Sequence, residues 1–242
     1  MNNYGKGPLI DTGPPTADFM SDRFSKPSEY YENVRTDIMS VMPAQAPRIL
    51  EVGCGAGNTL RYLKDRGTAA WVGGIELNDE AALTARERVD RLWHGDAAKL
   101  LDTPDGPASE GPYDAILCLD VLEHLVDPWA LTKRLANMLA PGGAIIAVLP
   151  NIRFYKVALA LLLRGEWTYE ESGVLDSTHL RFFTKSTMIE MFEHAGLGVE
   201  AMEPTAHMKP WRNKWILNYL SGGQLMDIYA YAYKIRAVKQ QV

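Results

Sequence analysis

"ILEVGCGAGN", residues 49–58, is the stretch that decides the fold. An apolar run that passes directly into closely spaced glycines predicts a buried strand ending in a tight turn, because a residue without Cβ lets a ligand approach the backbone. The glycines stand at Gly53, Gly55 and Gly57. A dinucleotide fingerprint, Gly-x-Gly-x-x-Gly, would need a further glycine where Asn58 stands. The turn therefore favours a nucleotide ligand other than a dinucleotide.

Strand-like and helix-like patterns alternate on the C-terminal side of this turn, which predicts an α/β fold with a doubly wound, Rossmann-like parallel sheet. Seven strands are expected, at 48–53, 69–77, 90–96, 113–120, 144–150, 197–204 and 226–238. Helices are expected at 28–43, 59–67, 78–89, 127–143, 153–164, 184–196 and 210–223. Asn78 and Asp127 are expected to cap two of these helices. Tyr229, Tyr231 and Tyr233 are expected on one face of the last strand.

Composition limits the class of protein. The chain has 242 residues, 47% of them hydrophobic and 23% charged, and a net charge of −5. These values predict a globular domain over 21–242, preceded by a tail over 1–20, and they argue against a nucleic-acid partner. We expect a cofactor half over 44–151 and a substrate or cap half over 152–242. Two cysteines and no sufficiently long apolar run favour a cytoplasmic protein without a membrane-spanning helix.

Two acids stand at the ends of neighbouring predicted strands. Glu76 ends the second strand, at about the 20-residue interval past the glycines where an acid receives the hydroxyls of a ribose. Asp96 ends the third strand, where a carboxylate could accept a hydrogen bond from the exocyclic amine of an adenine. Ligands of open parallel sheets bind beyond the carboxyl ends of the strands. The two acids together therefore indicate adenosine without a pyrophosphate.

The ordered segments "LEVGCGAGN", "IEL", "HGDA", "YDAILCLDVLEHLVDP" and "LAPGGAIIAVLPN" resemble the motif series of class I S-adenosylmethionine-dependent methyltransferases. The resemblance covers residues 48–151, and "DSTHLRFFTKSTMIEMFEHAGL" extends it toward bacterial small-molecule enzymes of sugar and cell-envelope pathways. It implies a seven-stranded sheet whose last strand is antiparallel, with helical insertions after strands five and six. It also implies S-adenosyl-L-methionine as the cofactor. The residues expected to bind the cofactor are Glu51, Gly53, Gly55, Gly57, Glu76, Leu77, Asp96, Ala97 and Leu119.

Methyl transfer to a hydroxyl needs a group that accepts the hydroxyl proton. His179, in "STHLRFF", and His124, in "DVLEHL", are the candidate catalytic residues, and each could instead be structural. No group of histidines and carboxylates has metal-ligand spacing along the sequence, so no metal is expected.

Three further residues are candidates for the substrate side. Tyr30 and Tyr31 belong to a leading helix that folds over the cofactor in the family, although plain helix packing explains them equally well. Asn151, after the fifth strand, could hydrogen-bond a substrate or cap the next helix. The aromatic and basic stretch 209–220 has three readings: a lid or homodimer face, a platform for a phosphorylated sugar, or an interfacial membrane helix.

The sequence therefore predicts an enzyme that moves a methyl group from S-adenosylmethionine to a small-molecule acceptor, with oxygen on a sugar or related metabolite preferred. Two alternatives remain open within this reading: N-methylation of a metabolite, and a module that binds the cofactor without turnover. An NAD-dependent oxidoreductase is disfavoured by Asn58 and Asp96.

Overall fold

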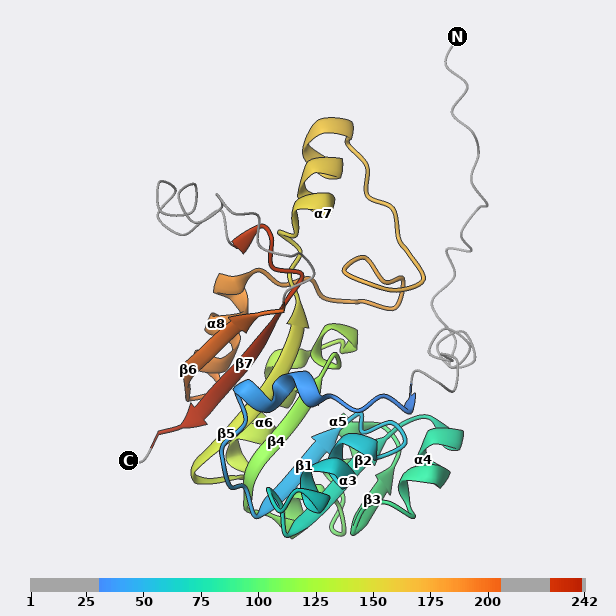
Figure 1. Ribbon diagram of the computed structural model, residues 1–242, viewed down its shortest axis with the longest axis vertical. Coiled ribbons are helices and arrows are strands. Elements are labelled where there is room, and N and C mark those ends of the chain that lie inside the picture. The colour runs from blue at the N-terminus through green and yellow to red at the C-terminus, as the bar shows by residue number, and fades with distance from the viewer. Residues whose placement is uncertain (1–30, 206–226, 241–242) are drawn as a thin grey trace.

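The computed structural model describes residues 31–205 and 227–240, and in this part of the chain seven strands form one sheet (Figure 1). The strands are β1 Arg48–Val52, β2 Trp71–Glu76, β3 Arg91–His94, β4 Tyr113–Leu119, β5 Leu139–Pro150, β6 Leu197–Pro204 and β7 Ala232–Lys239. The α-helices are α3 Asn58–Asp65, α4 Asp79–Ala85, α5 Ala97–Leu100, α6 Pro128–Asn137, α7 Tyr155–Leu159 and α8 Lys185–His194. Shorter turns of helix are η1 Thr36–Ser40, η2 Pro107–Glu110, η3 Leu122–His124 and the π-helix η4 Ala160–Arg164.

The sheet has the strand order β3-β2-β1-β4-β5-β7-β6. Strands β1 to β5 pair in parallel, whereas β7 runs antiparallel to both β5 and β6. The predicted fold class, with its antiparallel last strand, is confirmed. The strand order reverses between β1 and β4, which are neighbours in the sheet but distant in sequence. In open α/β sheets such a reversal opens a crevice at the carboxyl ends of the two strands.

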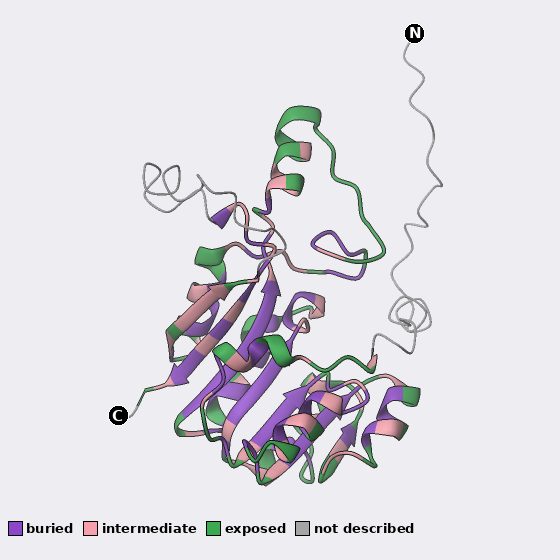
Figure 2. Cartoon of the chain, in the orientation of Figure 1, coloured by how far each residue is buried: buried purple, intermediate pink, exposed green. Residues whose placement is uncertain are grey.

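Both faces of the sheet are buried, as the apolar runs of its strands predict. In β1, Ile49 belongs to one apolar cluster and Leu50 to the other, because successive strand residues point to opposite faces. The first cluster also takes in residues of η1, α3 and α4, and the second takes in residues of α6 and α8. Figure 2 shows the inner strands as the most continuously buried part of the chain, whereas the edge strand β6 is mainly intermediate. The two apolar clusters, one on each face, hold the strands in place and so position the residues at the strand ends.

The expected helix caps are present where the sequence places them. The side chain of Asn78 accepts a hydrogen bond from the backbone N–H of Ala81, and that of Asp127 accepts one from Ala130. These side chains satisfy donors that have no partner within the helix. Thr184 and Thr187 form a reciprocal capping box at the start of α8.

Several expected elements differ from the structure. The helix expected over 127–143 ends at Asn137, and residues 139–143, expected to be helical, belong to β5. Within the described part of the helix predicted over 28–43, Tyr31 is helical and residues 36–40 form η1, but residues 33–35 between them are not helical. The backbone N–H of Arg35 instead donates to the hydroxyl of Thr59, which draws this segment across the start of α3. Tyr229 and Tyr231 precede β7 rather than lying in it, and their rings pack on Tyr155 and Phe154.

The chain leaves the sheet after β5 and forms a projection. Helix α7 and η4 extend beyond the sheet, and residues 161–172 are all exposed (Figures 1 and 2). This confirms the helix expected over 153–164 and the insertion expected after the fifth strand. The stretch 209–220 lies outside the described residues. None of the helices within 31–205 and 227–240 has the length and apolar character needed to cross a bilayer.

Candidate active site

The residues following β1 and β4 meet at the point where the strand order reverses. Gly53 follows β1, and a Cβ built on it would lie 2.7 Å from Cγ2 of Val121, two residues after β4. Only a glycine fits there without displacing Val121. The glycine turn and the segment leading into η3 therefore form the two sides of one crevice.

All three glycines of the turn have left-handed backbone conformations, with φ of 71°, 55° and 79° at Gly53, Gly55 and Gly57. Such values strain any residue with a Cβ. A Cβ on Gly55 would also lie 2.9 Å from the carbonyl oxygen of Tyr31, which accepts a hydrogen bond of 3.0 Å from the backbone N–H of Ala56. The segment preceding η1 thus lies directly on the glycine turn. The expectation that Tyr31 belongs near the site agrees with this contact, although its backbone makes it.

Glu76 joins the end of β2 to the glycine turn. Its Oε2 accepts a hydrogen bond of 2.7 Å from the N–H of Gly55, and its Oε1 accepts hydrogen bonds from the N–H groups of Leu77 and Asn78 at 2.9 and 2.8 Å. A carboxylate offers about four acceptor positions, so three backbone donors leave about one for a ligand. Binding of a ribose by Glu76 stays a prediction.

Glu51 is a buried carboxyl group near the end of β1. Burial, opposed by the positive charge of Arg35 and reinforced by the negative charge of Glu76, raises the pKa of Glu51 to about 8. Among the described residues, its Oε2 has no hydrogen-bond partner. A buried acceptor without a donor is costly, and a ligand that brings an N–H group would satisfy it.

Four more of the residues expected to bind the cofactor lie at the ends of β2, β3 and β4: Asp96 and Ala97 are expected beside the adenine, Leu119 under the methionyl chain, and Leu77 at an unspecified part of the cofactor. Leu77 is a large apolar residue with 58% of its surface exposed, and it immediately follows Glu76. Asp96 is exposed and caps α5, where its Oδ1 accepts a hydrogen bond of 2.8 Å from the N–H of Ala98. Ala97 is half-buried and Leu119 is buried. The exposed side chain of Leu77 could stack against a base, and the cofactor contacts of all four residues stay predictions.

Arg35 connects the segment before β1 to the end of β4. Its guanidinium pairs with Asp37 at 3.0 Å and, on its other side, with Asp120. Asp120 has φ of 56°, a left-handed conformation that is uncommon in a residue other than glycine. Backbone strain of this kind is concentrated at functional sites. The sequence reasoning did not identify either residue, and the departure of 33–35 from a helix is what brings Arg35 to this place.

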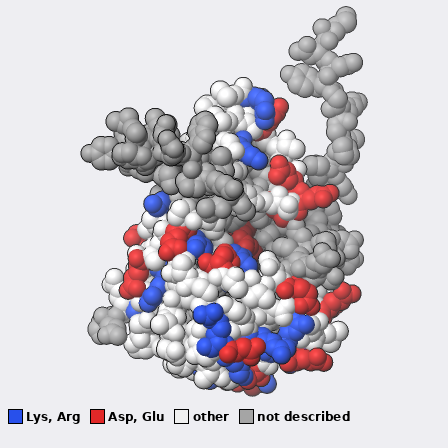
Figure 3. Space-filling model, viewed as in Figure 1, with Lys and Arg blue, Asp and Glu red and all other residues white. Residues whose placement is uncertain are grey.

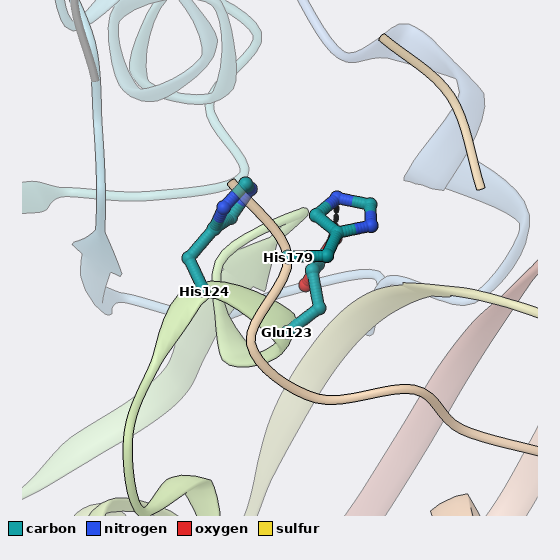
Figure 4. A group of neighbouring side chains, drawn as sticks. All are labelled: Glu123, His124 and His179. Atoms are coloured by element: carbon teal, nitrogen blue, oxygen red, sulfur yellow. Dashed lines mark ion pairs between the residues drawn. The ribbon is translucent and has the colours of Figure 1, made fainter. Parts of the chain in front are cut away.

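Two histidines from distant parts of the chain meet above η3 (Figure 4). The backbone N–H groups of Leu180 and Arg181 both donate to the carbonyl oxygen of Glu123, at 2.9 and 3.0 Å, which pins the loop after α7 to η3. The rings of His124 and His179 then pack edge to face, with centroids 4.8 Å apart. The structure thus brings the two predicted catalytic residues together.

Hydrogen bonds to backbone oxygens orient both rings. Nδ1 of His179 lies 3.1 Å from the carbonyl oxygen of Val174, and Nδ1 of His124 lies 3.2 Å from that of Thr178. Because a carbonyl oxygen can only accept, Nδ1 is the donor in each neutral ring. The basic lone pair of each ring is then on Nε2, as a proton acceptor requires.

Glu123, beside the histidines, was not singled out in the sequence. Its side chain is buried, and among the described residues neither carboxyl oxygen has a hydrogen-bond partner. Oε1 lies 3.9 Å from Nε2 of His179. Burial, and then the charges of Asp120 and Asp176, raise the pKa of Glu123 well above its usual range. The carboxyl group is therefore held in its protonated form more readily than an exposed glutamate.

No metal was expected, because no potential ligands have metal-ligand spacing along the sequence, but folding brings three potential ligands together. Glu123, His124 and His179 offer one oxygen and two nitrogen atoms within 4.8 Å of one another. Sequence spacing could not reveal this group, because one histidine follows β4 and the other lies beyond β5 and α7. The absence of a metal stays a prediction.

Asn151 is fully buried and braces the end of β5. Its side-chain nitrogen donates to the carbonyl oxygens of Asp227 and Ala230 at 2.7 and 3.0 Å, and its oxygen accepts from the N–H of Arg153 at 3.1 Å. Its expected contact with a substrate stays a prediction. Tyr30, the other expected substrate residue, lies outside the described residues.

Within the described residues, neither the charged surface in Figure 3 nor the hollow described below is a better candidate site than the crevice at the glycine turn. On the face in Figure 3, basic and acidic side chains are interspersed, whereas binding to a phosphate backbone would use a continuous basic surface. A hollow of about 500 Å³ lies beside Pro112 and Met138, which precede β4 and β5 at the opposite end of the sheet from the glycine turn.

Comparison with known proteins gives one consistent result. A family model described as a methyltransferase domain matches residues 19–201. The chain is 31% identical over 176 residues to a ubiquinone biosynthesis O-methyltransferase of Aeromonas salmonicida, a match that covers 70% of each protein. It is 29% identical over 206 residues to the protein of the same name from Xylella fastidiosa, with 78% of this chain and 76% of that protein covered.

Solved structures share the fold at low sequence identity. A magnesium protoporphyrin IX methyltransferase from Synechocystis with bound S-adenosylhomocysteine has a TM-score of 0.56 at 14% identity, covering 88% of this chain and 83% of that one. An S-adenosylmethionine-dependent methyltransferase from Archaeoglobus fulgidus has a TM-score of 0.58 at 16% identity, covering 92% and 99%. Their sheets support the arrangement described above.

Proposed function

Because this chain belongs to the class I S-adenosylmethionine-dependent methyltransferases, we propose that it transfers the methyl group of this cofactor to a hydroxyl oxygen of a small molecule. The observation that supports oxygen as the acceptor atom is the pair formed by His124 and His179 at η3, the helical turn that follows Val121 on one side of the crevice. A hydroxyl must lose its proton as it is methylated, and an imidazole with a lone pair on Nε2 can accept that proton. The relatives named O-methyltransferases support the same choice.

The chain's own residues suit the cofactor. The glycine turn keeps the crevice open where a Cβ would fill it, and Glu51 offers a buried oxygen in need of a donor. Leu77 provides an exposed apolar surface for the base. We propose that these residues hold the amino-acid part and the adenosine part at the two ends of the crevice. The cofactor supplies an activated methyl group, so the protein's task is to align the acceptor and exclude water.

The acceptor expected from the sequence needs a correction. A sugar gains no support from the relatives, whose names place them in ubiquinone biosynthesis. We therefore propose a small molecule with a hydroxyl group and leave sugars out. A cytoplasmic location also stays our proposal, and two buried cysteines without a disulfide, Cys54 and Cys118, support a reducing compartment. A homodimer remains a prediction.

The test uses the purified chain with S-adenosylmethionine carrying a ¹³C-labelled methyl group. Each hydroxyl compound, such as a catechol, is offered beside its amino counterpart, and carbon NMR of the product distinguishes O-methyl from N-methyl groups. We expect O-methyl products and S-adenosylhomocysteine in equal amounts. N-methyl products would overturn the choice of oxygen. Cofactor binding without any methyl transfer across the panel would favour the non-catalytic module.

A further inference from the structure

We propose that Asp176 and Thr178 are positioning residues for His124, and that His124 rather than His179 accepts the proton of the acceptor. The inference rests on the proposed hydroxyl methylation, since it assigns the base for that reaction. It starts from a buried chain of hydrogen bonds that runs from a carboxylate through a hydroxyl group to the imidazole.

The hydroxyl group of Thr178 donates its proton in a hydrogen bond to Asp176. Oγ1 of Thr178 donates to Oδ1 of Asp176 at 2.7 Å, and the backbone N–H of Thr178 donates to the same oxygen at 2.9 Å. Both residues are buried, with 4% and 5% of their surfaces exposed. An ionised carboxylate can only accept, so the direction of both bonds is fixed. The Thr178 oxygen can then only accept from any further neighbour.

That neighbour is Nδ1 of His124, 3.1 Å from Oγ1 of Thr178 and 3.2 Å from its carbonyl oxygen. Since both oxygens accept, Nδ1 carries the proton of the neutral ring and Nε2 carries the lone pair. The bond made by one ring nitrogen sets the role of the other. Asp176 thereby supports the Nδ1–H form of His124 that the Thr178 carbonyl also favours, because it keeps the Thr178 hydroxyl from donating to Nδ1.

The surroundings of the two histidines differ in ways that favour His124. His179 is 8% exposed, its Nδ1 is held by an uncharged backbone carbonyl, and its Nε2 faces the buried Glu123. His124 is half-buried. The carboxylate of Asp176, connected to His124 through Thr178, stabilises the imidazolium that forms when the ring takes up a proton. His124 thus combines greater exposure with a carboxylate connected to its Nδ1, whereas the carboxyl group beside Nε2 of His179 is that of Glu123, whose raised pKa favours the protonated form.

The reaction step balances with His124 as the proton acceptor and S-adenosylmethionine as the methyl donor. The acceptor O–H bond breaks and its proton goes to Nε2 of His124. The oxygen lone pair forms the new bond to carbon as the carbon–sulfur bond breaks, and that electron pair stays on sulfur. One positive charge leaves the sulfonium and one appears on the imidazole, which later releases its proton to solvent.

A first experiment reads the tautomer without any turnover. Histidine ¹⁵N NMR on the full chain, with His124 assigned through His124→Gln, distinguishes a protonated ring nitrogen from one with a lone pair. We expect the Nδ1–H form in the wild type and in Asp176→Asn, whose Oδ1 still accepts from Thr178. In Asp176→Ala the Thr178 hydroxyl is able to donate to Nδ1, so the Nε2–H form should grow. Ser177→Ala, at an exposed neighbour, is the control.

A second experiment measures kcat on a hydroxyl acceptor found by the labelled-methyl assay. Asp176→Ala should lower kcat by about tenfold to a hundredfold, with Asp176→Asn losing less, and should leave the affinity for S-adenosylhomocysteine unchanged. A wild-type Nε2–H form, or the same tautomer in Asp176→Ala, would overturn the inference even if O-methylation is established. Failure of the proposed function alone would show as absent O-methyl product with the tautomer pattern intact.

Discussion

The backbone N–H of Gly55 donates a hydrogen bond of 2.7 Å to Oε2 of Glu76, so the turn after β1 and the acid that ends β2 are one structural unit. From the sequence, Gly55 and Glu76 were each expected to bind the cofactor, but no bond between them was predicted. Their direct bond means that a change in either should alter both the shape of the crevice and its affinity for the cofactor.

Replacing Glu76 with alanine should weaken the protein and its cofactor binding together. The change leaves the N–H groups of Gly55, Leu77 and Asn78 without their acceptor, which costs about 1–3 kcal/mol of unfolding free energy. Affinity for S-adenosylhomocysteine should fall about tenfold to a hundredfold. Denaturant unfolding and calorimetry measure the two effects. Glu80→Ala, at an exposed position on α4, should leave both unchanged.

Gly55→Ala tests the contact between the glycine turn and the segment before η1. Gly67 provides the matched control, because its φ of 74° is also left-handed but a Cβ there would meet nothing within 4 Å. Gly67→Ala should cost about 1–2 kcal/mol of stability from the backbone alone. Gly55→Ala should cost more and also reduce cofactor affinity, since its Cβ must displace Tyr31. Equal effects of the two variants on stability, with affinity retained, would contradict this contact.

Glu51 should make cofactor binding release a proton. With its pKa raised to about 8, Glu51 is mostly protonated below that pH, and a cationic amino group of the cofactor would favour the ionised form. Between about pH 5 and 8, calorimetry in buffers of different ionisation enthalpy should detect this proton. Glu51→Gln should abolish the release. A wild-type enzyme that binds the cofactor with no proton exchange over this range would disprove the assignment.

The same pKa also predicts a trend in stability. Because the folded protein holds a proton on Glu51 that the unfolded chain loses near its ordinary pKa of 4.5, this group makes unfolding more favourable as pH rises toward about 8. The difference in unfolding free energy between Glu51→Gln and the wild type should therefore grow in favour of the variant over this range. Denaturant titrations at pH 5 and pH 8 measure it.

Arg35→Met should loosen the connection between the segment before β1 and the end of β4. Arg35 pairs with both Asp37 and Asp120 and is mostly buried, so its loss should cost about 1–2 kcal/mol and speed cofactor dissociation. Arg61→Met is the control, because the Arg61–Asp65 pair is 3.7 Å apart and exposed. Such a pair contributes about 0.5 kcal/mol or less. Stopped-flow release of S-adenosylhomocysteine should separate the two variants.

The regular part of the fold was predictable because each element satisfies its own local rules. The apolar runs of β1 and β4, the caps at Asn78 and Asp127, and the glycine turn all depend on residues close in sequence. The helix predicted over 28–43 is interrupted at residues 33–35, where the backbone N–H of Arg35 donates to the hydroxyl of Thr59, a tertiary partner that the sequence pattern does not reveal.

The catalytic side of the site depends on partners that are distant in sequence. His124 and His179 could each be proposed, but their contact follows from the bonds of Leu180 and Arg181 to Glu123. Asp176 and Thr178 carry no sequence signal beyond a common turn composition. Tyr229 and Tyr231 matched a strand pattern, yet the chain needs them to pack against Phe154 and Tyr155.

The position of β7 between β5 and β6 has a consequence for how the protein is made. Strand β6 pairs with β7 alone among the described strands, and β5 has β7 as its neighbour on that side. During synthesis, both strands therefore emerge from the ribosome with an unsatisfied edge, which stays open to aggregation until residues 232–239 have been translated. Premature termination just before this segment would leave a nascent chain that chaperones must protect or proteases remove.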